Sequence, residues 1–163
     1  MKNVCKHGMP ELNKVPEKFL LEQAENGLAG TVEPTEEERK NVQEWGEKVW
    51  DMLGDTVQKF PYPIVGLYLY DHTQCTKLFA GLEGVCLNQQ HTKTGERRAI
   101  IGLDVEPVRR GGPYLAFLLL HEISHAATAA TEHGDHFHQY LDYLLHCFNA
   151  EYGTSLVNDY CGD

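Results

Sequence analysis

The strongest constraint in this 163-residue sequence is a long apolar segment that carries ionisable side chains in its middle. Good helix formers follow Pro113, which suits the first position of a helix, so we expect one helix over residues 114–131. Its middle contains His121, Glu122 and His125. Burying two imidazoles and a carboxylate without partners costs several kcal/mol. The fold must therefore give these groups a partner, and a bound cation would serve.

The order His121, Glu122, two other residues, His125 is the helical metal-binding pattern H-E-x-x-H. Residues four apart lie about 40° apart around a helix, so both imidazoles face the same way, one turn apart. Both can then reach one Zn²⁺ ion at about 2.0–2.1 Å. Glu122 stands beside such an ion, where a base takes a proton from a bound water. The pattern predicts His121 and His125 as zinc ligands and Glu122 as the catalytic base.

A catalytic zinc ion usually has three protein ligands, so a third one is needed. Residues 132–138 offer five candidates: Glu132, His133, Asp135, His136 and His138. At about 100° per residue, His133 lies roughly 60° from the centre of the apolar stripe of the next helix, and His136 lies roughly 120° away. We therefore expect His133 to be the third ligand, with His136 or Asp135 as alternatives and Glu151 as a more distant one.

Charge is unevenly distributed along the chain. The net charge is -10, and all 14 Lys and Arg lie in residues 1–110, whereas residues 111–163 hold six of the nine histidines. Surfaces that bind phosphates or anionic membranes need fixed positive charge. The composition therefore argues against nucleic acid as a partner. It favours a cation, and neutral or basic peptide segments, in the C-terminal third.

The cellular location of the protein is indicated by features that the sequence lacks. No apolar run approaches the roughly 20 residues of a membrane span, so no membrane association is expected. The N-terminus has no apolar stretch typical of a secretory signal, which predicts a cytoplasmic protein. The five cysteines are an odd number without a C-x-x-C pair. They indicate reduced thiols, with a Cys75–Cys86 disulfide as the alternative.

The remaining pattern predicts an irregular arm over residues 1–34 and a single domain over residues 35–163. Thr35 and Glu38 have the spacing of a capping box, and apolar residues follow at helical intervals to Phe60. The expected elements are a helix over 35–60, strands over 64–70, 78–80, 85–87 and 97–105, the helix over 114–131, and a C-terminal helix capped by Asp135. We expect an α+β fold with a small, mostly antiparallel sheet of three to four strands.

The H-E-x-x-H helix and the following His133-Gly134-x-x-Phe137 segment resemble the minimal zinc metallopeptidases of the SprT-like and WLM type. The resemblance covers about residues 64–150. It implies a zincin-like core, one catalytic Zn²⁺ ion held by His121, His125 and His133, Glu122 as general base, and Phe137 as a packing residue. The zinc ribbon often appended in SprT-like proteins is missing, as are the basic residues that a DNA-associated protease would use.

These observations predict a zinc-dependent metallopeptidase that acts on a peptide or protein in extended conformation. Because the motif fixes how water is activated and not which bond is cut, the alternatives are a zinc-dependent hydrolase of a non-peptide amide and a non-catalytic zinc-binding module. An unligated carboxylate beside the ion, Glu122, favours an enzyme over a structural zinc site.

Three further expectations concern the surroundings of the site. An extended substrate typically lies along an edge strand in this type of fold, and the strand over 97–105 is the candidate. Tyr140, His136 and His138 are the candidates for a donor that stabilises negative charge on the substrate. The N-terminal Cys5 and His7 are candidates for an inhibitory arm that folds over the metal.

Overall fold

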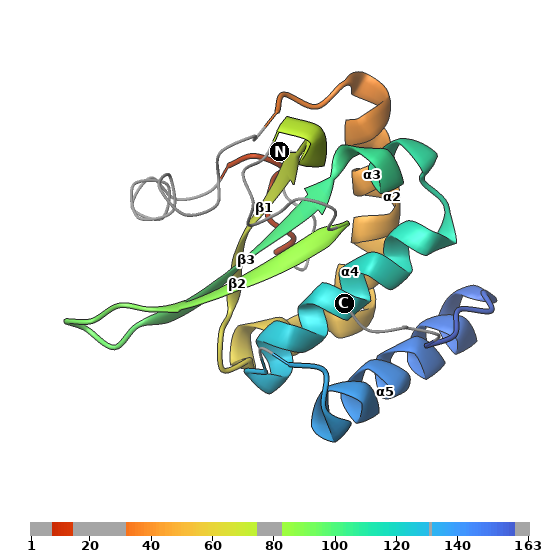
Figure 1. Cartoon of the computed structure of the whole chain (residues 1–163). Coiled ribbons are helices and arrows are strands. Elements are labelled where there is room, and N and C mark those ends of the chain that lie inside the picture. The colour runs from red at the N-terminus through yellow and green to blue at the C-terminus, as the bar shows by residue number, and fades with distance from the viewer. Residues whose placement is uncertain (1–7, 15–31, 75–82, 131, 159–163) are drawn as a thin grey trace.

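The computed structural model describes residues 8–14, 32–74, 83–130 and 132–158, which form an α+β fold (Figure 1). The elements are α2 (Glu36–Leu53), β1 (Ile64–Tyr70), β2 (Gly84–Gln90), β3 (Arg97–Asp104), α3 (Val105–Arg110), α4 (Pro113–Thr128) and α5 (Asp135–Tyr152), with short 3₁₀ helices over Gly54–Lys59 and His72–Gln74. α4 packs against β2, α2 and α5. The helix that carries the sequence motif therefore lies at the centre of the fold, between the sheet and α5.

β3 is the central strand of a three-stranded mixed sheet with the order β1-β3-β2. It pairs in parallel with β1, where Tyr70 lies opposite Asp104, and antiparallel with β2, where Gly84 lies opposite Leu103. The expectation of a mostly antiparallel sheet is therefore wrong for one of the two pairings. β2 and β3 are consecutive along the chain and form a hairpin, whereas β1 adds to the far side of β3. Strand propensity alone does not encode that order.

The two edges of the sheet differ in what covers them. Two described parts of the N-terminal arm contact β1, because the Asn13 N–H donates to the Leu67 carbonyl at 2.7 Å and the Val32 N–H donates to the Leu69 carbonyl at 3.0 Å. β2 forms the other edge, and no further strand pairs with it within the described ranges. The expectation that residues 97–105 form an edge strand is wrong, since β3 is bonded on both sides. The edge strand is β2.

The helices follow the sequence signals with four differences. The helix expected over residues 114–131 ends at Thr128. The capping box is confirmed, but α2 ends at Gly54, whose φ of +59° breaks the helix, and residues 54–59 continue only as a 3₁₀ turn. α3 is absent from the elements that the sequence predicts. Pro107 lies in the first turn of α3, where no backbone N–H is needed. Gly134, and not Asp135, occupies the N-cap position of α5.

Some expectations concern residues outside the described part of the chain. The short strand over 78–80, most of the arm, Cys5, His7 and Cys75 lie there. Cys86 is a free cysteine, so the alternative of a Cys75–Cys86 disulfide is wrong.

The main hydrophobic core lies between the sheet and the helices. Each helix of this layer contributes fully buried side chains, including Trp50 from α2, Leu119 from α4 and Phe148 from α5. A smaller cluster with Tyr68 and Ile100 lies apart from it. Among the helices that the structure describes, none has both the length and the apolar character needed to cross a membrane.

Glu38 joins the start of α2 to α3. Its side chain accepts from the Thr35 N–H at 2.8 Å, the Thr35 hydroxyl accepts from the Glu38 N–H at 3.1 Å, and Arg109 Nε lies 2.7 Å from the second carboxylate oxygen. Glu38 is 1% exposed, whereas its partner Arg109 is largely exposed. One carboxylate therefore satisfies a helix end and holds the short helix that leads into α4.

We expect Glu38→Ala to lower the free energy of unfolding by about 1–2 kcal/mol, because the variant loses half of the capping box and leaves Arg109 unpaired. Denaturant unfolding followed by circular dichroism measures the change. Glu37→Ala is the matched control, since Glu37 is an exposed carboxylate in the same first turn. Equal stability of the two variants would contradict this role for Glu38.

Candidate metal centre

Three histidine side chains converge where α4 ends. His121 and His125 come from successive turns of α4, and His133 comes from the connection between α4 and α5. One ring nitrogen from each lies within 4.8 Å of the other two. His121 and His125 are 5% and 9% exposed, and His133 is partly buried. The structure thus brings together the three residues that the sequence predicted as ligands.

The end of α4 fixes which nitrogen of His125 carries the proton. His125 Nδ1 lies 2.7 Å from the carbonyl oxygen of Ala130. A carbonyl oxygen only accepts, so Nδ1 carries the hydrogen and Nε2 of the neutral ring has a lone pair. The carbonyl comes within reach because Ala129 ends the helix in the left-handed conformation, with φ +56° and ψ +28°. A backbone partner of this kind is what orients metal-binding histidines in proteins.

The Nε2 atoms of His125 and His133 lie 3.1 Å apart. Two nitrogen ligands at about 2.0–2.1 Å from one tetrahedral zinc ion would be separated by roughly 3.3 Å. The observed separation is close to this value. The donor set of three imidazole nitrogens is also one that zinc commonly takes in catalytic sites. The side chains therefore fit one Zn²⁺ ion.

Phe137 forms the floor on which the three imidazoles pack. Its ring is fully buried, and its centroid lies 5.1 Å from that of His121, 4.5 Å from that of His125 and 4.8 Å from that of His133. The expectation that Phe137 packs at the site agrees with this geometry. The apolar floor limits the directions in which the three rings can turn.

His121 is held in its neutral form. Burial lowers its pKa to about 3, and the neighbouring imidazoles of His125, His133 and His138 contribute to the shift. A neutral imidazole offers its lone pair to a cation, whereas a protonated one repels it. The ring of His121 is therefore ready to bind a metal ion at neutral pH without first losing a proton.

Glu122 lies against the start of the edge strand β2. It is 4% exposed, and a Cβ atom built on Gly84 would come within 3.0 Å of its Oε2 atom and within 3.3 Å of its Cγ atom. The Glu122 side chain thus occupies the space that any larger residue at Gly84 would fill. Glu122 directly follows His121 in α4, and its carboxylate is not part of the histidine group.

Asn88 holds β2 against α4, and Cys86 of the same strand bonds to Asn88. Asn88 Nδ2 donates to the His125 carbonyl at 3.2 Å, and the Cys86 thiol donates to Asn88 Oδ1 at 3.4 Å. Burial, with the charge of Glu122, raises the pKa of the Cys86 thiol, so the thiol is protonated at neutral pH. Sequence reasoning missed Gly84, Cys86 and Asn88. The sequence feature that could have identified them is their spacing of two residues, which places all three on one face of a strand.

The other candidate ligands lie outside the histidine group. Asp135 and His136 are exposed in the first turn of α5, and Glu132 and Glu151 are also exposed. None of the four belongs to the group around His121. His138 is partly buried, and its ring centroid lies 6.4 Å from that of His133. The geometry therefore favours His133 over His136 and Asp135 as the third ligand.

A second group of ligand-type side chains, Asp71, His72 and Asp104, lies at the ends of β1 and β3. The two carboxylate oxygens of Asp104 lie 2.8 Å from the His72 backbone nitrogen and 2.9 Å from His72 Nδ1, and the second also accepts from the Glu106 N–H at 3.3 Å. The hydrogen bond that the His72 ring donates to the Asp104 carboxylate raises the pKa of His72. These bonds join the ends of two strands to the cap of α3, which accounts for the group without a metal.

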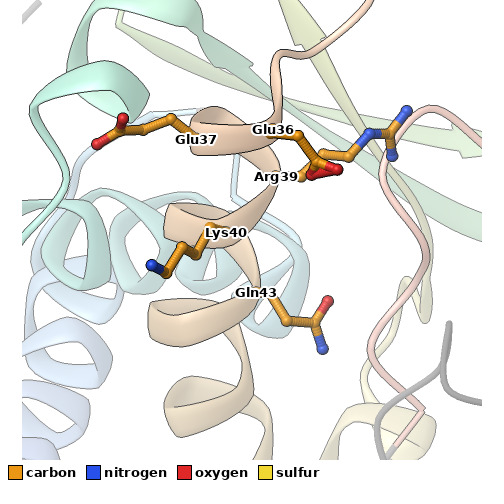
Figure 2. Close-up of a pocket in the computed structure, with 5 residues that line it drawn as sticks. All are labelled: Glu36, Glu37, Arg39, Lys40 and Gln43. Carbon is orange, nitrogen blue, oxygen red and sulfur yellow. The ribbon is translucent and has the colours of Figure 1, made fainter.

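A surface hollow of about 620 Å³ lies along α2 and is unrelated to the histidines (Figure 2). Its lining residues are Glu36, Glu37, Arg39, Lys40 and Gln43. Figure 2 shows their side chains leaving the helix in different directions, with acidic and basic groups mixed. No set of convergent groups in this hollow suggests a site.

Comparison of the chain with protein-family models, with curated proteins and with solved structures found no match.

We expect the purified chain to bind one Zn²⁺ ion. His133→Ala should weaken zinc binding at least about 100-fold, because losing even an outer-shell partner of a ligand costs about 10–100-fold. His136→Ala, a histidine from the next turn that lies outside the group, is the matched control and should bind zinc as the wild type does. Metal analysis and competition with a chelator measure both. Loss of zinc from His136→Ala, or unchanged binding by His133→Ala, would contradict the ligand assignment.

Proposed function

We propose that this chain is a zinc-dependent metallopeptidase with a zincin-like core similar to that of the SprT-like and WLM peptidases. The observations that carry the proposal are the convergence of His121, His125 and His133 and the burial of the Glu122 carboxylate, which directly follows His121 in α4. A structural zinc site has no use for a carboxylate that stands next to its ligands without belonging to them. This arrangement supports an enzyme over a non-catalytic zinc-binding module.

The proposed reaction is hydrolysis of a peptide bond. Zinc bound by three imidazoles lowers the pKa of a bound water to about 7 and polarises a carbonyl group. Glu122 accepts a proton from the attacking water, whose oxygen forms a bond to the carbonyl carbon. Glu122 then delivers this proton to the leaving nitrogen as the C–N bond breaks. The products are a carboxylic acid and an amine, and the carboxylate of Glu122 is regenerated.

The substrate is proposed to lie in extended conformation along the outer edge of β2. This strand is an edge of the sheet, and its first residue, Gly84, lies against Glu122. A peptide that adds to a sheet edge is held by main-chain hydrogen bonds, which are independent of its sequence. Such binding would bring a backbone carbonyl close to the base. The absence of Lys and Arg from residues 111–163 favours neutral or basic peptides over acidic ones.

Glu122→Gln should retain zinc and lose cleavage by about 10²–10⁴-fold, because the amide fills the same space but accepts no proton. The measurement combines metal content with cleavage of an unstructured protein and of quenched fluorescent peptides. Glu132→Gln, an exposed carboxylate close to the site in sequence, is the matched control and should cleave as the wild type does. A zinc-free wild type, or equal cleavage by wild type and Glu122→Gln, would overturn the proposal.

Gly84→Ala should lower kcat about 10-fold or more and leave zinc content unchanged. The added Cβ would stand 3.0 Å from Glu122 Oε2 and 3.2 Å from Leu118 Cδ1, so the flexible end of the base must shift. The matched control is Gln90→Ala, an exposed position in the same strand. Steady-state kinetics on one peptide measure both variants. An unchanged kcat in Gly84→Ala would show that the base does not depend on this contact.

A further inference from the structure

The edge strand β2 meets α4 through two contacts of different kinds. Near the start of the strand, Gly84 lies against Glu122, which is outside the group of candidate ligands. Four residues further along, Asn88 Nδ2 donates to the main-chain carbonyl of His125 at 3.2 Å, and His125 belongs to that group. Of these two contacts, the second therefore joins β2 to a residue that would hold the metal ion.

The orientation of the Asn88 amide is fixed at both of its ends. A main-chain carbonyl only accepts, so the atom that faces His125 is the amide nitrogen. At the other end, the Cys86 thiol donates to Asn88 Oδ1 at 3.4 Å, and burial keeps this thiol protonated by raising its pKa. The Asn88 side chain is partly buried. The amide thus has one orientation, with its donor directed to the helix.

The carbonyl that Asn88 binds is linked to the imidazole of the same residue. The Ala130 N–H donates to the His125 carbonyl at 3.2 Å, and His125 Nδ1 donates to the Ala130 carbonyl at 2.7 Å. These two bonds close a loop between the two residues, so the direction of the His125 carbonyl and the direction of its ring depend on each other. Such hydrogen-bond partners orient the histidines that bind metals. Asn88 therefore acts on the ring through this loop.

We propose that Asn88 is a positioning residue that couples the docking of β2 on α4 to metal binding at His125. The inference deepens the proposed function: it rests on zinc binding by the histidine group and is independent of peptide cleavage. A ring held in place by a metal ion keeps the His125 carbonyl in the direction that Asn88 needs. A docked Asn88 leaves the ring less freedom to lose when the ion binds. Because coupling of this kind is reciprocal, each event favours the other by the same factor.

The coupling has a consequence for the edge of the sheet. β2 is the strand along which the substrate is proposed to lie. In the zinc-free chain, this strand opens from α4 more often than in the zinc-loaded chain, because local opening follows the local free energy. The metal ion and the strand that would hold a peptide are then in place together.

The first test measures zinc affinity by competition with a chelator. Asn88→Ala should weaken zinc binding about fivefold or more, which is the lower end of typical coupling between two sites. Gln90→Ala is the matched control, since it removes an exposed amide from the same strand, and it should bind zinc as the wild type does. Wild-type affinity in Asn88→Ala would overturn the proposal.

The second test measures hydrogen exchange of residues 84–90 in the full chain, on amides that exchange by local opening. In the wild type, zinc should raise their protection by the same factor as Asn88→Ala weakens zinc binding, within about twofold. In Asn88→Ala, zinc should leave their protection unchanged. A hydrogen bond that is merely structural would speed exchange in the variant equally with and without zinc, and that result would overturn the coupling.

A measurement on the wild type keeps the proposal testable if Asn88→Ala does not fold. The side-chain amide hydrogens of Asn88 should exchange more slowly once zinc is added, because their acceptor is then held in place. Those of Gln90, which is exposed, should exchange at the same rate in both states. Exchange at Asn88 that does not depend on zinc would overturn the proposal.

The outcomes separate this inference from the proposed function. A wild type that binds zinc, shows the coupling and cleaves no peptide would overturn the peptidase function and leave the role of Asn88 standing. A wild type that cleaves peptides and shows no coupling would overturn the role of Asn88 alone. A wild type that binds no zinc would overturn both.

Discussion

The burial of two imidazoles and a carboxylate inside α4 is the constraint on which the rest of the structure depends. Removing such groups from water is unfavourable unless neighbouring elements of the fold supply space and polar or charged partners for them. β2 does so by leaving the Cβ position of Gly84 empty for Glu122 and by binding the His125 carbonyl through Asn88. α5 contributes Phe137, which packs against the rings. The nitrogens of the three histidines lie close enough together that they could hold one metal ion, and three imidazoles are a donor set that zinc takes.

A single unfavourable residue conformation completes this arrangement. Ala129 is left-handed, which costs a non-glycine residue about 1–2 kcal/mol. Two bonds from the next residue offset this cost, because the Ala130 N–H donates to the His125 carbonyl at 3.2 Å and the Ala130 carbonyl lies 2.7 Å from His125 Nδ1. The turn also directs the chain back so that His133 meets His125. Strain of this kind persists where the surrounding contacts determine the geometry.

The sequence was sufficient for much of what depends on residues close together along the chain, although it missed α3 and the N-cap of α5. Helical spacing placed His121 and His125 on one face, and the phase of the next helix favoured His133. The capping box of Thr35 and Glu38 was equally local. Strand order was not predictable in this way, because whether β3 or β2 lies at the edge depends on pairing between distant segments. The same reason hid Gly84 and Asn88, whose partners lie 38 and 37 positions away along the chain.

The distribution of these contacts along the chain also bears on how the molecule forms. The three histidines lie within residues 121–133, so one helix end and one turn bring them together, and short loops close at low entropic cost. The surroundings of Glu122 arise only when β2 docks against α4, a contact between distant segments that forms later in folding. Metal capture can therefore precede assembly of the sheet. On the proposed function, a newly made chain would hold its zinc before it could hydrolyse anything.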